Sequence, residues 1–312
     1  MLSRAEVAQL LDVRSLISAL AQGFVRLSSG EVSVPPRVAA DAPGGFLGVM
    51  PGWTRDIALA AKLVSVFREN HAVGLPSHQA LIAMFDEVTG APVAVMDGTE
   101  ITAVRTAASA ALAVRELARA DARVLVIVGA GVQGAAHLRA VPLVRAFAEV
   151  RVASRSFAHA SVLASSVAGV VAVESIEDAV RGADVVCCCT DAPSPVVQRS
   201  WLREGAHVSS VGASRVGPEL DAQTIADASV FVESRVACSA PPAGAWELVG
   251  ASASSVTELG EVLAGLRPGR RSDAELTVWK SMGHAVEDAV AARLVLDAAR
   301  RLGVGREVDL SG

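Results

Sequence analysis

The stretch GAGVQG, residues 129–134, constrains the fold of this chain more than any other. It directly follows the apolar run RVLVIV and directly precedes a helix-like segment. In a strand–turn–helix unit of this kind, Gly129 makes the turn, Gly131 lets a pyrophosphate approach the backbone, and Gly134 lets helix and strand pack closely. Amide groups at the start of the helix then bind the phosphates. We therefore predict a dinucleotide-binding turn here; the alternative is an ordinary tight turn between a strand and a helix.

The region from Ala122 onward repeats this alternation of strand and helix. Continuous β-branched runs without polar alternation are what a parallel sheet covered on both faces requires. The predicted strands lie in RVLVIV, VRVAS, VVAVES, DVVCCCT, HVSSVG and VFVES, and later in ELTVWKS. We therefore predict an α/β fold in which residues 119–283 form a doubly wound, Rossmann-type dinucleotide-binding domain. A long helix from Gly283 to about Leu302 follows, and its pattern alone does not decide which domain it packs against.

The first 118 residues have a different pattern. Ser3 and Glu6 have the spacing of a capping box at a helix start, and a second amphipathic helix runs to about Ser28. Short apolar segments punctuated by Pro and Gly then predict an antiparallel or mixed sheet. They are EVSVPPRV, GFLGVMPGW, IALAAKLVSVF, HQALIAMFD and APVAVMD. A long Ala-rich helix over residues 100–118 ends this part, which we predict to be a second, α+β domain.

Composition narrows the functional classes. Hydrophobic residues make up 52% of the chain, but the apolar runs are broken every few residues. None reaches the roughly 18 residues needed to cross a bilayer, and no basic segment precedes an apolar start as in a secretory signal. A net charge of −5 without a basic stripe offers nucleic acid no binding surface. We therefore expect a soluble, cytoplasmic protein without membrane or nucleic-acid partners.

The cysteines suggest no metal centre. Cys187, Cys188 and Cys189 are consecutive, and Cys238 is the fourth cysteine. The chain has no CxxC pair, and consecutive strand residues point to opposite faces, so this run cannot form a metal cluster. We expect small apolar side chains that fill a buried strand, in a reducing compartment.

The stretch EVRVASRS, residues 149–156, bears on the choice of cofactor. It ends the second predicted strand, where an NAD-binding chain usually carries an acid for the adenosine ribose. Ser154, Arg155 and Ser156 stand there instead. A guanidinium and hydroxyls attract a 2′-phosphate that a carboxylate would repel. The stretch therefore favours NADP(H), with NAD(H) as the alternative if Arg155 is an ordinary solvated arginine.

Three cations have surroundings that suggest an anionic substrate. Arg37 follows two prolines that stiffen it, and Arg105 has no acid four residues away on its helix of small residues. Two arginines can grip a carboxylate in a fork. An unpaired Lys62 would be costly to bury in its apolar strand, so we expect it to face a polar cleft and to titrate low. The structural alternatives are salt bridges to a dimer partner for the arginines and an edge-strand position for Lys62.

Motifs along nearly the whole chain resemble one family. They are PPR at 35–37, FLGVMP at 46–51, AAKLV at 60–64, PSHQA at 76–80, VMDGTEITAVRTAA at 95–108, GAGVQG, VGASR at 211–215, ELD at 219–221 and SMGHAVED at 281–288. In this order they resemble the ornithine cyclodeaminase/μ-crystallin family, and most closely its μ-crystallin branch. The resemblance implies a homodimer built through the sheet domain, with the last helix returning to that domain and the active site in a cleft beside the nucleotide. The domains are then 1–118 with 284–312, for substrate binding and dimerisation, and 119–283.

Two departures from the family pattern narrow the reaction. Ornithine cyclodeaminases resembling this chain carry a glutamate where Gly48 stands and an aspartate where Ser214 stands. Without either acid, the second ammonium of a diamine would stay unpaired, which costs several kcal/mol. We therefore do not expect ornithine cyclisation. The segment 234–250 also departs from the family pattern, so substrate size is not inherited, and lone histidines such as His78 and His284 are more often satisfied locally than catalytic.

The resemblance and the residues together predict NADPH-dependent reduction of small cyclic ketimines that bear a carboxylate, such as Δ1-pyrroline-2-carboxylate and Δ1-piperideine-2-carboxylate. Arg37 and Arg105 would hold the carboxylate, Lys62 would hydrogen-bond near the imine nitrogen or relay its proton, and Ser214 would border the substrate. The residues expected at the cofactor are Gly129, Gly131, Val132, Gln133, Gly134, Ser154, Arg155, Ser156, Thr190, Gly212 and Arg215. The alternatives are an NAD-dependent ornithine cyclodeaminase, an amino acid dehydrogenase and a non-catalytic ligand-binding protein.

Overall fold

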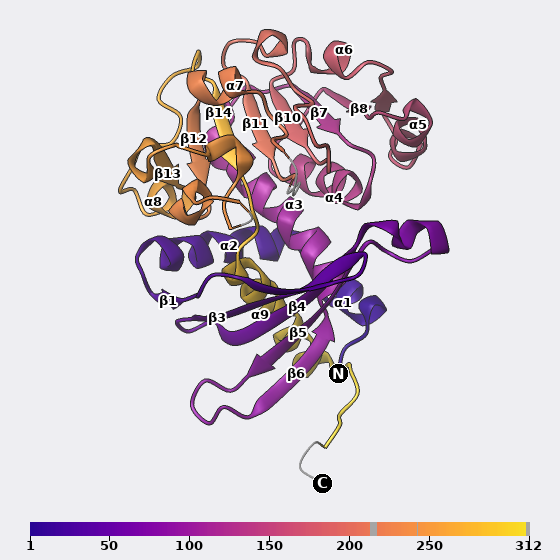
Figure 1. Ribbon diagram of the computed structural model, residues 1–312, viewed down its shortest axis with the longest axis vertical. Coiled ribbons are helices and arrows are strands. Elements are labelled where there is room, and N and C mark those ends of the chain that lie inside the picture. The colour runs from indigo at the N-terminus through magenta and orange to yellow at the C-terminus, as the bar shows by residue number, and fades with distance from the viewer. Residues whose placement is uncertain (213–216, 242, 310–312) are drawn as a thin grey trace. The chain divides into compact units, whose positions relative to one another are not determined.

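The computed structural model describes residues 1–212, 217–241 and 243–309. The chain divides into two compact units. Unit 1 comprises Met1–Arg105 and His284–Gly312, and unit 2 comprises Thr106–Gly283. The boundary falls inside a long helix, α3 (Gly98–Leu117), so one helix contributes to both units (Figure 1).

Unit 1 contains an antiparallel sheet. The sequence predicted an antiparallel or mixed sheet here, and the first of these is confirmed. Its strands are β1 (Val32–Ser33), β2 (Val38–Ala42), β3 (Gly45–Thr54), β4 (Ala58–Phe67), β5 (His78–Phe85) and β6 (Pro92–Asp97). The order is β1-β3-β4-β5-β6, and β2 also pairs with β3. The β2–β3 hairpin turns at Gly44, whose φ of 85° is the left-handed conformation that such short turns need.

Besides the first turns of α3, unit 1 contains the helices α1 (Arg4–Leu10), α2 (Val13–Ser28) and α9 (Ala285–Leu302). The predicted capping box forms, with Ser3 and Glu6 each binding the other's backbone. Helix α9 packs against α2 and against β3 and β4, which answers the question that its sequence pattern left open (Figure 1). A Cβ on Gly23 of α2 would lie 2.8 Å from Val290 Cγ2 of α9, so glycine is what allows the two helices to approach this closely.

The two faces of this sheet differ. Met50, Lys62, Ile82 and Met96 occupy one cross-strand row over β3, β4, β5 and β6, and all four side chains are buried. The side chains of the adjacent cross-strand row point to the opposite face of the sheet, where large apolar side chains are exposed. Its members include Leu63 and Leu81, which are direct cross-strand partners. Lys62 therefore lies in the middle of the inner, apolar face.

Unit 2 is built on eight parallel strands, which confirms the predicted doubly wound fold. They are β7 (Val124–Val128), β8 (Glu149–Ala153), β9 (Val170–Ala172), β10 (Val185–Cys188), β11 (His207–Ser210), β12 (Ser229–Val232), β13 (Val256–Glu258) and β14 (Thr277–Lys280). Their order is β13-β12-β14-β11-β10-β7-β8-β9. The last strand, which the sequence predicted in ELTVWKS, inserts between β11 and β12.

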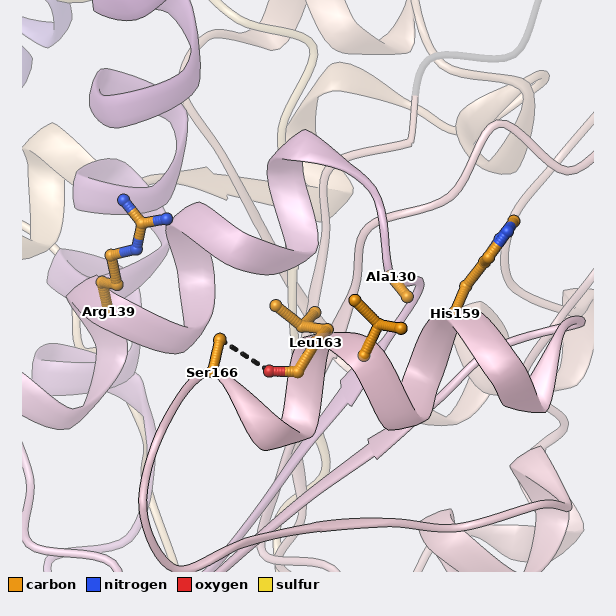
Figure 2. Close-up of a pocket in the computed structure, with 6 residues that line it drawn as sticks. Ala130, Arg139, His159, Leu163 and Ser166 are labelled. Atoms are coloured by element: carbon orange, nitrogen blue, oxygen red, sulfur yellow. Dashed lines mark hydrogen bonds between the residues drawn. The ribbon is translucent and has the colours of Figure 1, made fainter.

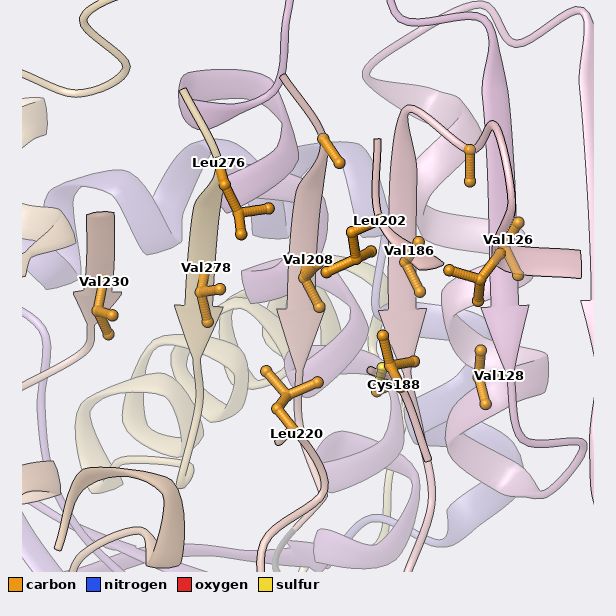
Figure 3. Packing of buried hydrophobic residues seen from close by; sticks show 14 of the residues in the cluster. Val126, Val128, Val186, Cys188, Leu202, Val208, Leu220, Val230, Leu276 and Val278 are labelled. Atoms are coloured by element: carbon orange, nitrogen blue, oxygen red, sulfur yellow. The ribbon is translucent and has the colours of Figure 1, made fainter. Parts of the chain in front are cut away.

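Helices cover both faces of this sheet. The α-helices that follow α3 in unit 2 are α4 (Val132–Ala140), α5 (Phe157–Ser165), α6 (Ile176–Val180), α7 (Ala222–Asp227) and α8 (Leu259–Leu263). On one face, Val126, Val186 and Val208 belong to one buried core (Figure 3), and Val180 of α6 is part of the same core. On the other face, Ile127 lies against α4 at Gly134. Because both faces are covered, the strands carry continuous apolar runs instead of alternating ones.

The cysteine run lies in the sheet as expected. Cys187 and Cys188 end β10 with buried side chains, and all four cysteines are free thiols. Burial raises the pKa of Cys187 to about 12, so this thiol is not a reactive nucleophile. Among the residues that the structure describes, no three His, Cys, Asp or Glu side chains come together to hold a metal ion. Within the same ranges, no helix has both the length and the apolar character that spanning a bilayer requires.

Candidate active site

In the glycine-rich turn between β7 and α4, the space beside the central glycine, Gly131, is empty. Gly129 has a φ of 110°, and a Cβ there would lie 2.6 Å from the Cys189 carbonyl oxygen. A Cβ on Gly134 would lie 2.0 Å from the Gly129 carbonyl oxygen, so helix and turn touch. Gly131 differs, since no atom lies within 4 Å of its Cβ position, and it begins α4 without a side-chain cap. A pyrophosphate fits this uncapped helix start.

The turn lies where the strand order reverses. β7 pairs with β8 on one side and with β10 on the other, and ligands of doubly wound sheets bind outside the strand ends at this point. Thr190 follows β10, and its Cγ2 lies 3.2 Å from the Cβ position of Gly129. Of the predicted cofactor residues, Gly129 and Thr190 are thus brought together at one edge of the sheet.

Glu219 joins Thr190 to Gly212, the loop residue after β11. Its Oε1 accepts hydrogen bonds from the Thr190 backbone N–H and from Thr190 Oγ1, each at 2.7 Å. Its Oε2 accepts from Ser210 Oγ at 2.7 Å and from the Gly212 N–H at 2.9 Å. The carboxylate is buried. One buried acid therefore fixes the two loops that follow the central strands β10 and β11.

Lys280 extends this network from the end of β14. Its Nζ donates to the Gly212 carbonyl oxygen at 2.8 Å, to Glu247 Oε1 at 3.0 Å and to Ser210 Oγ at 3.1 Å. Glu247 Oε1 also accepts from the Glu219 N–H at 2.7 Å. Glu247 belongs to the segment 234–250, which departs from the family pattern. This segment is therefore anchored to the loops beside the glycine-rich turn.

The predicted 2′-phosphate residues form a local turn between β8 and α5. Ser154 Oγ donates to the Ser156 carbonyl oxygen at 2.8 Å and accepts from the Ser156 N–H at 3.2 Å. Ser156 caps α5 by accepting from the His159 N–H. Arg155 is exposed, and in the described part of the chain its guanidinium is paired with no acid. The serines shape the turn, and the turn presents the arginine to solvent.

A surface hollow lies between α4 and α5, next to the glycine-rich turn. Figure 2 shows Arg139 at one end of it and His159 at the other, with Leu163 between them. Ser166 Oγ at the end of α5 donates to the Leu163 carbonyl oxygen at 2.7 Å, so its hydroxyl is used within the helix end. Ala130, the second residue of GAGVQG, also lines the hollow.

Lys62 in unit 1 is buried and paired. Its side chain is 3% exposed, and its Nζ lies 2.6 Å from Asp288 Oδ2 of α9. The sequence predicted a lysine that avoids unpaired burial by facing a polar cleft, whereas here an acid on a helix far away in the sequence pairs with the buried ammonium. The edge-strand alternative was wrong, because β4 is hydrogen-bonded to β3 on one side and β5 on the other.

Arg105 is paired with two acids of the same helix. Its Nη1 donates to Glu287 Oε2 at 2.5 Å, and its Nε donates to Asp288 Oδ1 at 3.1 Å. The expectation of an arginine without an acid partner holds only within its own helix and is wrong for the folded unit. Lys62, Arg105, Glu287 and Asp288 thus form one buried cluster with two positive and two negative groups.

Burial sets the charge balance of this cluster. It lowers the pKa of Lys62 to about 8, even though the charge of Asp288 raises it. The lysine therefore titrates low, as expected, although it is paired. Burial alone would raise the pKa of Asp288, but Lys62 and Arg105 outweigh this effect and lower it. The acid stays ionised at neutral pH, while the lysine exchanges its proton close to neutral pH.

Other predicted site residues are placed as follows. Arg37 directly precedes β2 and is exposed, so its pairing with Arg105 on one substrate carboxylate stays a prediction. Ser214 and Arg215 lie outside the described residues. His284 caps α9 by accepting from the Val286 N–H, and His78 Nδ1 lies 3.2 Å from Ser77 Oγ. Both histidines have local structural partners, as lone histidines usually do.

Sequence reasoning missed the acids and one lysine. Glu287 and Asp288 stand in the motif SMGHAVED, but sequence spacing connects Arg105 only with residues of its own helix. Lys280 lies in an apolar strand, which is the same signal that singled out Lys62. Glu219 lies in the motif ELD, where nothing local shows that its carboxylate turns inward.

A family model and several known proteins match this chain over nearly its whole length. The family model "Ornithine cyclodeaminase/mu-crystallin family" matches residues 1–302. The ketimine reductase mu-crystallin of Mus musculus is 39% identical over 306 residues, which cover 95% of this chain and 96% of the relative. Two solved structures are also similar over nearly their whole length.

The first is the Δ1-pyrroline-2-carboxylate reductase of Thermococcus litoralis in complex with NADH and L-proline. It has a TM-score of 0.93 and 34% identity, and the match covers 98% of this chain and 99% of that one. The second is an archaeal alanine dehydrogenase dimer with bound NAD, with a TM-score of 0.90, 29% identity and coverage of 99% and 98%. The chain therefore belongs to the ornithine cyclodeaminase/mu-crystallin family, as its motifs indicated.

Proposed function

We propose that this protein is a nicotinamide-dependent oxidoreductase that reduces small cyclic ketimines bearing a carboxylate to cyclic amino acids. The observation that carries the proposal is the buried pair of cations in unit 1, Lys62 and Arg105, which acids of α9 hold beside each other. Relatives with a matching chain include a ketimine reductase and a pyrroline-2-carboxylate reductase that holds NADH and L-proline.

Each group of residues has one task in this reaction. When bound at the glycine-rich turn, a nicotinamide cofactor would supply the hydride, and with it the two electrons, that C2 of the imine requires. Arg105 and Arg37 bind the carboxylate, which orients C2 and the imine nitrogen. Lys62 hydrogen-bonds to that nitrogen and supplies the proton that forms the amine N–H, then regains a proton from water. A lysine whose pKa is about 8 is suited to this exchange, because acid–base groups work best near the operating pH.

We propose NADP(H) as the preferred cofactor. Arg155 is exposed on a turn that Ser154 and Ser156 hold in place, and an acid is absent from this described turn. A guanidinium there attracts a 2′-phosphate. The solved relatives hold NADH or NAD, so NAD(H) is the alternative that must be measured beside it.

We propose that the protein is a homodimer joined through the outer face of the unit 1 sheet. Leu47, Leu63 and Leu81 are 44%, 36% and 54% exposed on neighbouring strands of this face. Contiguous apolar side chains at a surface mark interaction sites. Leu81→Arg should convert the dimer to a monomer in analytical ultracentrifugation, whereas Val171→Arg, at an exposed position of unit 2, should not. A wild-type protein that sediments as a monomer at micromolar concentration would contradict this.

The experiment that tests the reaction follows NADPH absorbance with Δ1-pyrroline-2-carboxylate, with Δ1-piperideine-2-carboxylate, and with pyruvate plus ammonia. We expect turnover with at least one cyclic ketimine and a lower kcat/KM with pyruvate. The reverse order would make the protein an amino acid dehydrogenase, which the similarity to the alanine dehydrogenase supports as the second candidate. Tight nucleotide binding with no oxidation by any substrate would instead indicate a ligand-binding protein, and ammonia release from ornithine would indicate a cyclodeaminase.

A further inference from the structure

The chain contains only two lysines, Lys62 and Lys280, whereas its other 26 Lys and Arg residues are all arginine. Both lysines are buried, with side chains 3% and 1% exposed. An arginine keeps its proton at any pH that the fold survives, whereas a buried ammonium can lose its proton near neutral pH. Unlike the arginines of this chain, a lysine at position 62 can therefore lose and regain its positive charge by losing and regaining a proton.

Asp288 contacts both cations of the unit 1 cluster, with one oxygen for each. Its Oδ2 lies 2.6 Å from Lys62 Nζ, and its Oδ1 accepts from Arg105 Nε at 3.1 Å. Glu287, its neighbour in the chain, is paired with Arg105. Because one rigid carboxylate joins the two cations, the position of each depends on the other.

The backbone that carries Asp288 is held firmly. Asp288 lies in the first turn of α9, where the helix dipole stabilises a carboxylate. His284 caps this turn, and Ala285 packs so closely on β3 that a Cβ on Gly52 would lie 3.3 Å from the Ala285 Cβ. The Asp288 side chain is itself 3% exposed, so solvent cannot replace it as a partner.

We propose that Asp288 is a positioning residue, which holds Lys62 Nζ and the Arg105 guanidinium in one fixed arrangement and keeps Lys62 protonated until the imine takes the proton. This inference deepens the proposed ketimine reduction and rests on it for its role in turnover. The link between Asp288 and the charge of Lys62 does not rest on it, since this link follows from the contacts alone.

In the part of unit 1 that the structure describes, the charged groups around Lys62 come from two helices. Helix α9 presents Asp288 and Glu287, and α3 presents Arg105. The cross-strand neighbours on β3 and β5 are Met50 and Ile82, which carry no charge. Removing the charge of Asp288 therefore leaves two buried cations with one acid, and Lys62 is the only one of the two that can lose its proton.

The experiment uses the two-lysine composition. Protein labelled with ¹³C at the lysine ε-carbon gives two signals, and Lys62→Met assigns them. In the wild type, the Lys62 signal should titrate near pH 8, below the ordinary lysine pKa of about 10.4. In Asp288→Asn, its midpoint should fall further by roughly 1–3 pH units, the usual effect of one close opposite charge. Glu287→Gln should shift it less, and Asp297→Asn, an exposed acid farther along α9, should not shift it.

The kinetic readout is the pH profile of kcat/KM with a ketimine. The high-pH limb reports loss of the Lys62 proton, so it should move down in Asp288→Asn by the same amount as the NMR midpoint and return toward the wild-type position in Asp288→Glu. A folded Asp288→Asn protein with an unmoved Lys62 signal overturns the inference. If that variant does not fold, Asp288→Glu decides: its longer side chain keeps the charge but moves it relative to Lys62 Nζ, so the Lys62 midpoint should still shift, by less than expected for Asp288→Asn, and an unmoved midpoint overturns the inference. If the wild type reduces no imine, the proposed function fails, while the same titrations still decide whether Asp288 sets the charge of Lys62.

Discussion

Gly212 lies so close to Glu219 that a Cβ on the glycine would be 2.6 Å from the carboxyl carbon. The same carboxylate accepts the Gly212 N–H at 2.9 Å and two hydrogen bonds from Thr190. The Glu219 carboxylate therefore holds together the loops after β10 and β11. Because a side chain at position 212 would collide with this carboxylate, the predicted cofactor residue there has to be glycine.

Glu219→Gln should destabilise unit 2 and weaken nucleotide binding. A glutamine can accept on one oxygen only, so its NH₂ group would face donors that the carboxylate now satisfies. Each unsatisfied buried group costs about 1–3 kcal/mol, and we expect a loss of about 2 kcal/mol or more in urea unfolding. Fluorescence titration with NADPH should give a higher Kd for the variant than for the wild type.

Glu177→Gln is the matched control, because Glu177 is an exposed partner of Arg181 on α6. Exposed pairs of this kind contribute less than about 0.5 kcal/mol. Equal unfolding free energies for the two glutamine variants would mean that the Glu219 network does not stabilise the loops.

The cofactor preference should depend on Arg155. Charge-assisted hydrogen bonds to a 2′-phosphate contribute on the order of 1.5–3 kcal/mol, so kcat/KM should favour NADPH over NADH by roughly 10- to 100-fold. Ser154→Asp combined with Arg155→Ala should reverse the order, and rising salt should weaken the wild-type preference. Arg181→Ala, which removes another exposed arginine of unit 2, should not change it. A wild type that prefers NADH would show that Arg155 stays in solvent.

Acid should destabilise unit 2 through buried neutral histidines. Burial lowers the pKa of His137 on α4 to about 4 and that of His207 on β11 to about 3, from an unfolded value near 6.5. The unfolded chain therefore binds these protons first as pH falls. Stability from His137 is complete above pH 6.5 and declines between pH 6.5 and about 4, at about 1.4 kcal/mol per pH unit.

Urea unfolding at several pH values can isolate this contribution. His137→Leu should reduce the dependence of the unfolding free energy on pH, between pH 6.5 and about 4, by the contribution of one proton. His159→Leu, at an exposed position on α5, should leave this dependence unchanged. Identical slopes for wild type and His137→Leu would show that His137 is already protonated in the fold.

Local signals predicted the fold well. The capping box at Ser3 and Glu6 and the turn at Gly129 each depend on residues within a few positions of one another, and both form as predicted. The parallel sheet followed from apolar runs that need no knowledge of their partners. The inner and outer faces of the unit 1 sheet could not be predicted in this way, because neighbouring residues such as the exposed Leu81 and the buried Ile82 are both apolar.

The partners of Arg105 show what the sequence could not predict. Its two acids stand 182 and 183 positions away in the chain, so no spacing rule connects them. Their side chains meet only because α9 packs on the inner face of the sheet. The type of residue at the site was readable from the sequence, whereas the charge state of Lys62 depends on a partner that only the fold supplies.

Lys62 itself gives the sharpest test of the proposed reaction. Lys62→Met should fold and bind NADPH nearly normally, because Asp288 keeps its pairing with Arg105 and the methionine matches the apolar row of β3 and β5. Turnover of a cyclic ketimine should fall by about 10²-fold or more, the usual scale for a lost acid–base group. Lys62→Arg separates charge from proton transfer, since a guanidinium keeps the positive charge but does not release a proton. We expect it to be nearly as slow as Lys62→Met and to lose the high-pH limb of the profile. Full activity in Lys62→Arg would show that position 62 needs only a charge, and the proton would then have to come from another group.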